Sequence, residues 1–577
     1  MSEIGTASAA KVLFTGRILA ENLLPYPALK DKDRDSLGMI VEAIDQFLRP
    51  KSADFKRWDR DGAQPAEFIQ GLRDLGLFGL IIPEEFGGLG LSNAGYARIL
   101  AQTSRHDSSV SLTIGAHSSI GMKGILLFGT PEQKSRYLPG LASGEAIAAF
   151  CLTESGAGSD AASIRTRAEK NADGSWTLNG EKIWITNGGI ADVYTVFART
   201  ASDAGKITAF IVEAGWPGVS HGHHEDKMGI RASSTTTVNF ADVRVPPENV
   251  LDEEGKGFKV AMAILNNGRT GLGGGAVGGM KALLALSTAQ ARGRRQFGHA
   301  IADYDLVKDK IAQMTVDCFA AESVVWMVAH YIDAGFDDYS LEAAISKVFA
   351  SEAMQRSAYE ALQIAGGSGF MRDYPYEQVV RDSRILTIFE GTNEVLRLYI
   401  ALSGLKDLGR SFAELKNALD DIFNHPIKGF GVLGDYAERR LTQATGIGRD
   451  RIAALVPAAL GEASAVYEKY TLELAKTADF VLRRHGKAIA DRQFDLRRIA
   501  DIAIDLFVGL CVLSRAASLA AEPAAGAQAV SIANIFAAQA KRRMAAAIRR
   551  ITRNEDDAVR GLADHVLDKG GYGWDVL

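Results

Sequence analysis

Cysteine is scarce in this chain, and the few cysteines present form no pattern. Cys151, Cys318 and Cys511 are the three among 577 residues, and none belongs to a CxxC pair. Neither a zinc site nor a disulfide framework is indicated, so we expect no bound metal and a reducing compartment. A large excess of one charge is also missing. The formal net charge of −5 gives no global attraction to membranes, and no nucleic-acid partner is expected.

Targeting and membrane-spanning segments are missing as well. Met1 to Lys11 are polar and small, without the basic and apolar regions of a secretory signal. We count no stretch that reaches the roughly 18 apolar residues of a spanning helix. We therefore expect a cytoplasmic protein that is soluble or lies at the inner face of a membrane. Its 577 residues exceed what one hydrophobic core holds, so two to four domains are expected.

The spacing of apolar residues divides the chain into stretches. It is helical from about residue 36, becomes strand-like near 150, and is helical again past Gly255. This order differs from the alternation of strands and helices that marks a Rossmann fold. We predict an N-terminal arm, a helical domain, a β domain, a second helical domain and a helical extension, over residues 1–35, 36–149, 150–255, 256–405 and 406–577.

The β domain carries a hairpin signal. Trp176 to Leu178 and Lys182 to Ile185 are rich in strand-forming residues, and Asn179-Gly180 between them is typical of a tight turn. We predict two strands joined by this turn. Further strands are predicted at 193–198, 207–212 and 237–245, and long helices around 258–297, 303–334 and 341–365.

The strongest catalytic candidate is Glu390. An apolar strip ending at Phe389 leads to it, and Gly391 to Asn393 is predicted as a turn before a helix that begins at Val395. Partial desolvation raises the pKa of a glutamate from about 4.3 toward neutrality, which suits a general base for a weakly acidic C–H. A carboxylate that only offsets a helix dipole explains this run about equally well.

Two glycine-containing runs suggest a nucleotide ligand. Gly273 to Gly278 matches GxGxxG, but no strand precedes it, so close packing of helices is the better explanation. Phe150 to Asp160 is a loop with hydroxyls where helix gives way to sheet. Its Gly156 and Gly158 would let a ligand approach the backbone. An ordinary loop between domains is the more common explanation.

Three more runs carry groups suited to a cofactor. Trp184 to Gly188 offers an aromatic ring for a flat heterocycle, although a strand with a buried tryptophan is common. Arg292 to Gly298 places cations at a helix end, where they suit the helix dipole or a pyrophosphate. Asn266 to Arg269 offers a guanidinium and two amides for a phosphorylated nucleotide, or forms a surface turn.

Taken together and in this order, these runs resemble the acyl-CoA dehydrogenase family, most closely its very-long-chain branch. The resemblance extends from about Leu23 to the C-terminus. The helical extension after residue 405 separates this branch from shorter relatives. Its specific elements are Phe150 to Asp160, Trp184 to Gly188, Asn266 to Arg269, Arg294 to Gly298, Gln363 to Gly369 and Phe389 to Asn393.

The resemblance implies an α+β fold with an N-terminal helical domain, a middle β-barrel, a C-terminal four-helix domain and the helical extension. It implies FAD as cofactor, an acyl-CoA as substrate and electron-transferring flavoprotein as electron acceptor. Because the family shares FAD across subunits, it also implies a homodimer or a dimer of dimers. Peripheral membrane contact through residues 406–577 is a further hypothesis taken from relatives of this branch.

Residue roles follow from the same resemblance. The isoalloxazine contacts it implies are Phe150, Cys151, Leu152, Thr153, Trp184, Ile185 and Thr186. Contacts to the FAD of a neighbouring subunit are Arg294, Gln296, Phe297, Gln363, Ile364, Ala365, Gly366 and Gly367, and those near the adenosine are Thr392, Asn393 and Glu394. Ser159 is counted with both the cofactor and the CoA portion, and the other substrate contacts are Asn266, Asn267, Gly268, Arg269, Phe389 and Gly391.

The family's reaction then gives Glu390 its role. It removes the pro-R α-proton of the thioester, the β-hydrogen leaves as hydride to flavin N5, and a trans-2-enoyl-CoA results. The Glu390 N–H and a ribityl hydroxyl would hold the thioester oxygen, as an oxyanion hole does. Some members carry the base at the position of Gly268, and since glycine cannot act as a base, Glu390 has no competitor there.

The chain departs from the family pattern in two places. Ser155 stands where proline is usual and should loosen the loop slightly. Gly273 to Gly275 replaces helix-forming residues, at about 0.5–1 kcal/mol per glycine relative to alanine. Leu112 to Ala116 falls where the family lines its acyl tunnel, and its small residues either leave room for a long chain or pack helices.

The extension contains two candidate surfaces. One is an apolar helix face whose accompanying polar face is mostly acidic, which favours packing against protein over lipid insertion. Its apolar residues are Phe412, Leu415, Leu419, Ile422 and Phe423. The other is a basic stripe that is better explained as a solvated helix face, formed by Lys541, Arg542, Arg543, Arg549, Arg550 and Arg553.

Two rival functions stay open at this point. The first is an acyl-CoA oxidase, with the same base and flavin but O₂ as acceptor. The second is a scaffold or assembly protein built on the same fold. The presence of Glu390 and of every flavin motif argues against a catalytically dead scaffold.

Overall fold

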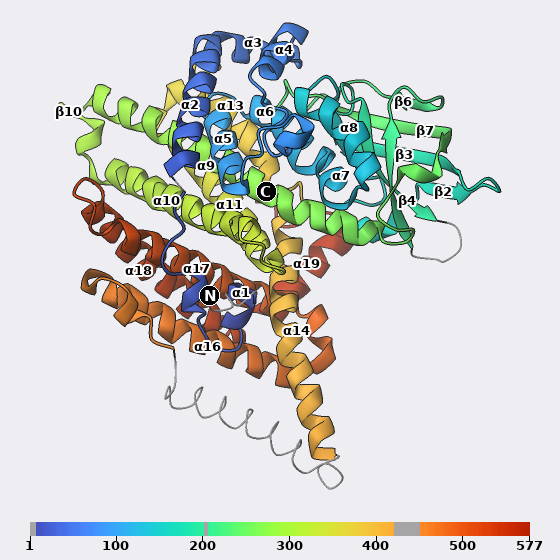
Figure 1. Ribbon diagram of the computed structural model, residues 1–577. Helices are drawn as coiled ribbons and strands as arrows, with labels where there is room; N and C mark the ends of the chain where they lie inside the picture. Colours follow the sequence, from blue (N-terminus) through green and yellow to red (C-terminus); the bar gives the residue numbers. More distant parts are fainter. Residues whose placement is uncertain (1–6, 30, 201–205, 421–449, 577) are drawn as a thin grey trace. The chain divides into compact units, whose positions relative to one another are not determined.

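A computed structural model describes residues 7–29, 31–200, 206–420 and 450–576, without the side chains of 31–33, 407 and 409–420. The chain forms two compact units. One unit is Tyr26–Val395, and the other combines Met1–Pro25 with Leu396–Leu577. Figure 1 labels many of the helices and strands named below.

Short helices open the Tyr26–Val395 unit. Their starts follow the capping rules: Ser92 and Asp107 accept backbone N–H groups at the starts of α5 and α6, and Thr130 and Gln133 form a capping box on α8. A π-helical stretch, Ala116–Gly121, leads from α6 toward α7. The helices are α2 (Asp31–Leu48), α3 (Ser52–Asp61), α4 (Ala66–Asp74), α5 (Asn93–Ser104), α6 (Ser108–Gly115), α7 (Lys123–Phe128) and α8 (Pro131–Ser143).

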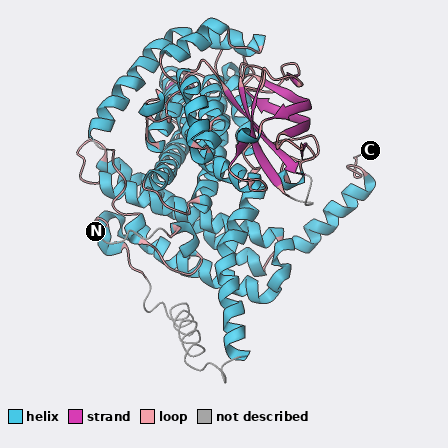
Figure 2. Ribbon diagram, turned by 45° about the vertical axis from the view of Figure 1, so that its right-hand side comes forward, coloured by secondary structure: helices cyan, strands magenta, loops and turns pink. Residues whose placement is uncertain are grey.

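A β domain follows, as predicted, and Figure 2 shows its strands gathered in one part of this unit. The strand order is β6-β7-β3-β2-β4-β5-β8, and β1 pairs in parallel with β4, with Ala148 opposite Val193. The strands are β1 (Ala148–Cys151), β2 (Arg167–Lys170), β3 (Trp176–Thr186), β4 (Val193–Thr200), β5 (Ile207–Glu213), β6 (Val219–His221), β7 (Thr235–Val245) and β8 (Val250–Leu251).

The hairpin predicted at Asn179-Gly180 is wrong. β3 runs through these residues without reversing, and its pairing with β7 shifts register between Leu178 and Gly180. Gly180 has a φ of 150°, which L-residues with a side chain rarely adopt, so the strand bends at a bulge. The reversal lies between β2 and β3 instead, where the Asn171 N–H donates to the Ser175 carbonyl at 2.7 Å.

Three long helices pack beyond the β domain, close to the predicted positions: α9 (Gly257–Gly293), α10 (Asp305–Asp333) and α11 (Ser340–Ala365). The glycine-rich run does not break α9. A Cβ on Gly274 would lie 2.5 Å from the Ala97 carbonyl oxygen, and one on Gly278 would lie 2.0 Å from that of Ala101. These glycines therefore let the backbone of α5 approach α9, which is the packing explanation given for the GxGxxG match.

The second unit is helical. It contains α1 (Ala9–Leu13), the part of α14 (Asn393–Asp420) after Val395, α16 (Gly461–His485), α17 (Gln493–Leu519), α18 (Gly526–Thr552) and α19 (Asp556–Lys569). The N-terminal arm contains regular structure, because α1 lies within it. Phe14 is fully buried with its ring 2.3 Å from the Cβ position of Gly404, and the Ser514 hydroxyl donates to the Leu23 carbonyl.

Two helices, α10 and α17, are long and apolar enough to cross a membrane by length and composition, contrary to the expectation from sequence. Of their most apolar windows, 61% and 78% of the residues are buried. Burial of this kind is typical of core helices, so the composition is weak evidence for a span. The apolar face proposed for residues 412–423 lies outside the side chains that the structure describes.

Candidate functional site

Glu390 lies in a strained turn between two helical segments. A 3₁₀ turn at Ile385–Thr387 precedes it, and α14 begins three residues after it, at Asn393. Its φ is 55°, in the left-handed region that side-chain-bearing residues seldom adopt, and Gly391 follows with a φ of 93°. Non-glycine residues persist in this conformation where their surroundings hold them, and such positions cluster at functional sites.

The Glu390 carboxylate lies against the middle of α9. The residue as a whole is half-buried, but its Oε2 is inaccessible to solvent and has no hydrogen-bond partner. A Cβ on Gly268 would lie 3.6 Å from each carboxylate oxygen and 2.9 Å from the Ile120 Cγ2 methyl. Glycine at position 268 therefore leaves the space beside the carboxylate that any larger side chain would fill.

Burial decides the acidity of this group. Desolvation raises the pKa of Glu390 to about 7, although the charges of Arg269 and Lys347 act in the opposite direction. A carboxyl group with a pKa near 7 populates both its protonated and its ionised form at neutral pH. It can accept a proton from a weak carbon acid far better than an ordinary surface glutamate.

A buried lysine, which sequence analysis did not identify, holds the turn after Glu390. Lys347 on α11 is inaccessible to solvent, and its Nζ donates to the Gly391 carbonyl at 2.8 Å and to Asn393 Oδ1 at 2.9 Å. The available signal was one lysine within the apolar run 343–350 of a predicted helix. A charge almost never occupies such a position without a partner.

Asn393 belongs to this anchor. Its Nδ2 donates to Ser351 Oγ at 3.0 Å and to Glu352 Oε1 at 3.1 Å, while its Oδ1 accepts from Lys347. The side-chain amide is buried and fully engaged. A cofactor contact by Asn393 stays a prediction, and with the side chain engaged it would be made by the backbone.

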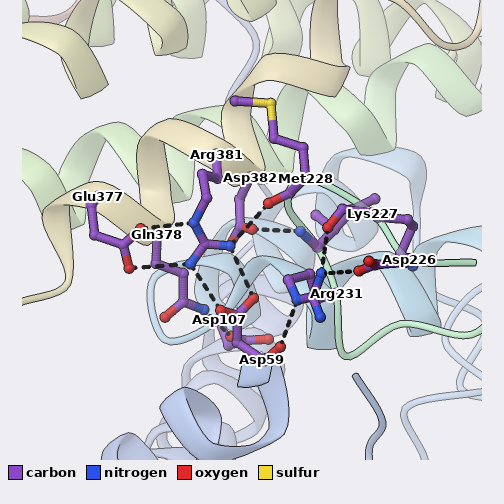
Figure 3. A network of polar contacts seen from close by, with 11 residues as sticks. Asp59, Asp107, Asp226, Lys227, Met228, Arg231, Glu377, Gln378, Arg381 and Asp382 are labelled. Atoms are coloured by element: carbon purple, nitrogen blue, oxygen red, sulfur yellow. Dashed lines mark hydrogen bonds and ion pairs between the residues drawn. The ribbon is translucent and has the colours of Figure 1, made fainter. Parts of the chain in front are cut away.

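The helix that leads to Glu390 is tied to two other elements by a polar network (Figure 3). On α13 (Tyr376–Arg384), Arg381 donates to Asp59 of α3 at 2.8 Å and to the Met228 carbonyl at 3.0 Å. The next residue, Asp382, accepts the Ile230 N–H. The loop before β7, helix α3 and α13 are thus held together immediately upstream of the turn.

Two acids in this region are deeply buried. Burial, reinforced by the charge of Asp107, raises the pKa of Asp382 to about 8. Burial also raises the pKa of Asp107 to about 6, and the Asp59 charge adds to that. Gln378 lies at Asp107 with an Nε2–Oδ2 distance of 3.5 Å. At neutral pH, Asp382 is therefore mainly protonated.

On the β domain, Trp184 presents its ring to solvent. It is 63% exposed and has a φ of 56°, so the alternative of a buried tryptophan is wrong. The preceding Ile183 N–H donates to the Thr153 carbonyl at 2.9 Å, which brings the loop after β1 beside β3. Phe150, Thr153 and Thr186 are half-buried next to it.

Three of the residues predicted to line the isoalloxazine have buried side chains. Cys151 and Ile185 are buried in the core of the β domain, and Leu152 is buried in the core shared with the helices. Successive strand residues point to opposite faces, so Ile185 points inward next to the exposed Trp184 on β3. These three positions can offer backbone groups to a ligand, but not their side chains.

A buried ion pair underlies the loop after β1. Lys182 Nζ lies 2.7 Å from Glu154 Oε1 and 3.1 Å from the Leu152 carbonyl, and Glu154 also accepts the Thr166 N–H at 3.0 Å. Burial opposes the ionisation of Glu154, but Lys182 together with hydrogen bonds from Arg165 and Thr166 outweighs it, and the pKa of Glu154 falls below its ordinary value. Ser155 and Ser159 are exposed on the loop that this ion pair holds in place.

The run 266–269 is part of α9, so the surface-turn alternative is wrong. Asn267, Gly268 and Arg269 are buried, and Asn266 is half-buried. Arg269 Nη1 donates to Asn266 Oδ1 at 2.5 Å, and Asn267 Nδ2 donates to the Tyr339 hydroxyl at 2.5 Å. The structure thus brings Gly268 and Arg269 close to Glu390.

The remaining predicted positions lie mostly at the surface. Phe297, at the tip of a hairpin of β9 (Arg295–Gln296) and β10 (His299–Ala300), is 93% exposed with a φ of 51°. Thr392 Oγ1 accepts the Val395 N–H at 3.3 Å and so begins α14. Exposed positions are Arg294, Gln296, Gln363, Gly366, Gly367 and Glu394; half-buried ones are Phe389, Gly391 and Thr392; Ile364 and Ala365 are buried.

These observations fit a flat aromatic cofactor. Trp184 offers an exposed ring, Thr186 lies on the same strand, and the loop after β1 that carries Thr153 lies beside this strand. The buried Glu390 Oε2 has no hydrogen-bond partner, as expected for a group that meets a bound ligand. Within the described residues, the Glu390 N–H also donates to no carbonyl.

Comparisons with known families cover nearly the whole chain. Residues 34–145, 149–243 and 255–405 match the N-terminal, middle and C-terminal domains of acyl-CoA dehydrogenase. Residues 458–572 match the ACAD9/ACADV C-terminal domain.

Individual relatives agree with these domains. The very long-chain specific acyl-CoA dehydrogenase of Rattus norvegicus mitochondria is 44% identical over 88% of this chain and 78% of its own. An acyl-CoA dehydrogenase complexed with FAD from Bacillus anthracis is 31% identical, with a TM-score of 0.81 over 99% of this chain and 97% of that one. A chain in a structure described as the electron transferring flavoprotein of Acidaminococcus fermentans is 37% identical, with a TM-score of 0.62 over 65% and 98%.

Proposed function

Since the chain belongs to the acyl-CoA dehydrogenase family and is an FAD-dependent acyl-CoA dehydrogenase, we propose that it oxidises long- or very-long-chain acyl-CoA thioesters to trans-2-enoyl-CoA, with Glu390 as the base. Electron-transferring flavoprotein is the proposed electron acceptor. The observation that carries the proposal is the Glu390 carboxylate, buried against Gly268 with an unpartnered Oε2 and a pKa raised to about 7.

The residues around the site divide the chemistry between them. Bound FAD supplies the hydride acceptor, and Trp184, Thr153 and Thr186 are the groups that would hold it. Glu390 takes the α-proton on its carboxylate, and its own N–H is available to the thioester oxygen as that oxygen gains charge. Burial around α9 keeps water from the base, which preserves its raised pKa.

Support for a long acyl chain comes from two sources. The rat relative, 44% identical over most of the chain, is named for very long chains. Gly115 and Ala116 are small and buried near the start of the π-helical stretch, in the run expected to line the acyl tunnel. For the electron acceptor, support comes from the similar chain in the electron transferring flavoprotein structure.

The proposed assembly is a homodimer. Phe297 is 93% exposed on a hairpin tip, and Phe370, in a short helix after Gly366, is 75% exposed. A contiguous patch of exposed apolar side chains marks an interaction surface, and the proposal places both phenylalanines at the subunit interface. Analytical ultracentrifugation of the wild-type protein and of Phe297→Ser would test it, because the variant should shift the population toward monomer.

We also propose a cytoplasmic protein with at most peripheral membrane contact through the region after residue 405. On α18, Lys541, Arg542, Arg549 and Arg550 are exposed, whereas Arg543 is bonded to Asp505 at 2.6 Å. Co-sedimentation with neutral and anionic liposomes is the test. Absence of binding to both would remove the membrane part of this proposal.

The central test is anaerobic mixing of the purified flavoprotein with palmitoyl-CoA and with octanoyl-CoA, with flavin absorbance as the signal. Faster bleaching by palmitoyl-CoA, abolished in Glu390→Gln with FAD retained, would support the base and the long-chain preference together. Hydrogen peroxide formed at the turnover rate in air would favour an oxidase. A protein that never purifies with flavin would favour the scaffold alternative.

A further inference from the structure

Lys347 is one of the largest fully buried side chains among the described residues, yet it lies in the middle of α11 among apolar neighbours. Burying an ammonium group is costly unless hydrogen bonds and opposite charge compensate it. Burial lowers the pKa of Lys347 to about 8, so the amine is still mostly protonated at pH 7. A buried cation is therefore retained beside the catalytic turn.

Its hydrogen bonds converge on the residues that follow the base. Nζ donates to the carbonyl of Gly391 and to the side chain of Asn393, which are one and three residues after Glu390. Both contacts lie in the segment where the backbone turns through positive φ at Glu390 and Gly391. Such a conformation persists when its surroundings determine it, and Lys347 supplies two of the bonds that do so.

Its charge also acts on the base. The charged and titratable groups that face Glu390 come from three helices: Tyr96 from α5, Arg269 from α9 and Lys347 from α11. The charges of Glu390, Arg269, Glu352 and Glu394 in turn act on the pKa of Lys347. Of the two cations, Arg269 is bonded to Asn266, whereas Lys347 is bonded directly to the Glu390 turn.

We propose that Lys347 is a positioning residue for the dehydrogenation, which fixes the Glu390 turn through Gly391 and Asn393 and stabilises the ionised form of the base through its charge. This inference rests on the proposed role of Glu390. A lysine that only satisfied the fold would give the same hydrogen bonds but would not set the ionisation of the base.

Two substitutions separate the two effects. Lys347→Gln keeps a donor for the turn and removes the charge, whereas Lys347→Arg keeps the charge and changes the donor geometry. The matched control is Lys123→Gln. Lys123 is another buried lysine of the same unit, on α7, with a pKa also lowered by burial to about 8, but it has no bond to the Glu390 turn.

The first readout does not depend on turnover. The infrared band of the protonated Glu390 carboxyl, isolated as the difference between wild type and Glu390→Gln, is followed against pH in each background. An opposite charge nearby lowers a carboxyl pKa, so its loss in Lys347→Gln should raise the Glu390 midpoint by about one pH unit. Lys347→Arg and Lys123→Gln should leave the midpoint within a few tenths of the wild-type value.

The second readout is the pH dependence of flavin reduction by palmitoyl-CoA. In Lys347→Gln, the acidic limb of the rate profile should move up with the infrared midpoint. In Lys347→Arg, the rate should fall about 10-fold or more across the profile with the limb in place, because the turn is displaced. An unmoved midpoint and limb in Lys347→Gln, with flavin content and thermal midpoint like those of the control, would overturn the inference.

The remaining outcomes are also decisive. If Lys347→Gln does not retain flavin, the test uses Lys347→Arg alone. This variant keeps the positive charge, so its Glu390 midpoint should stay near the wild-type value. A midpoint raised by about one pH unit in Lys347→Arg would overturn the inference. If palmitoyl-CoA and octanoyl-CoA leave the wild-type flavin oxidised, the proposed function fails. The infrared titration then still shows whether Lys347 sets the ionisation of Glu390.

Discussion

Gly268 and Glu390 are complementary where α9 meets the turn that carries Glu390. The Cβ position of Gly268 lies 3.6 Å from both carboxylate oxygens and 2.9 Å from a methyl of Ile120. A methyl at position 268 would meet the carboxylate at ordinary contact distance and crowd Ile120, so glycine keeps the space beside the carboxylate open. This relationship joins residues that are 122 positions apart in the sequence (390 − 268).

Substituting Gly268 by alanine should slow flavin reduction while the fold and flavin content are maintained. The new methyl would lie so close to Ile120 that the Ile120 side chain must move, and it would touch the carboxylate at ordinary contact distance. A displacement of a catalytic group by a fraction of an ångström to one ångström costs about 10- to 100-fold in rate. Stopped-flow reduction by palmitoyl-CoA measures the effect.

The control for this prediction is Gly275→Ala on the same helix. Its Cβ would meet nothing nearer than Ser111 Oγ at 3.5 Å, which is an ordinary contact. The control should keep the wild-type rate. Equal rates for Gly268→Ala and wild type would show that the space beside the carboxylate is not critical.

The reductive half-reaction should depend on pH through Glu390. Its pKa is raised to about 7, and only the ionised form can take a proton, so the rate should rise as pH increases through about 7 and level off above it. Single-turnover reduction between pH 5.5 and pH 8.5 would reveal this limb. A limb near pH 4.5 would mean that bound substrate or water solvates the carboxylate as fully as bulk water does.

The sequence could indicate Glu390 as a candidate because the signal is local. An apolar strip followed by a glycine turn is visible within a few residues, and so is the switch from helical to strand spacing near residue 150. Lys347 could not be found this way, since its partners Gly391 and Asn393 lie 44 and 46 positions away. Its own helix shows one lysine within an apolar run, which indicates that a partner exists but not which residues provide it.

Where sequence analysis was wrong, tertiary contacts overrode a local preference. Asn179-Gly180 is a good hairpin turn in isolation, but β7 pairs with both halves of β3 and keeps the strand running. Asn267 suited a surface turn by residue type, yet α9 continues through it and buries it against Tyr339. Likewise, the apolar side of α1 is explained only by the distant helices it packs on.

The close approach of α5 to α9 predicts a sharp difference between neighbouring glycines. Gly278→Ala places a methyl 2.0 Å from the Ala101 carbonyl oxygen, so the helices must separate, whereas Gly275→Ala meets open space or ordinary contacts. Overpacking of this kind costs about 1–3 kcal/mol or more. Thermal unfolding should show a clearly lower midpoint for Gly278→Ala alone. Equal midpoints would contradict the packing explanation of the glycine-rich run.

Asp382 should make the protein less stable as pH rises toward 8. Its folded-state pKa is raised to about 8 from the ordinary value of 3.8, so between these values the folded state holds a proton that the unfolded state has lost. Stability is therefore greatest at low pH with respect to this group, and it falls by up to about 1.4 kcal/mol per pH unit until Asp382 ionises near pH 8.

Asp382→Asn keeps an oxygen to accept the Ile230 N–H but removes the titration. The variant should thus gain in thermal midpoint over wild type as pH increases from 5 to 8, whereas Asp309→Asn, an exposed position on α10, should follow wild type throughout. A wild-type midpoint that rises relative to Asp382→Asn over this range would mean that Asp382 is ionised in the fold and stabilised by Arg381.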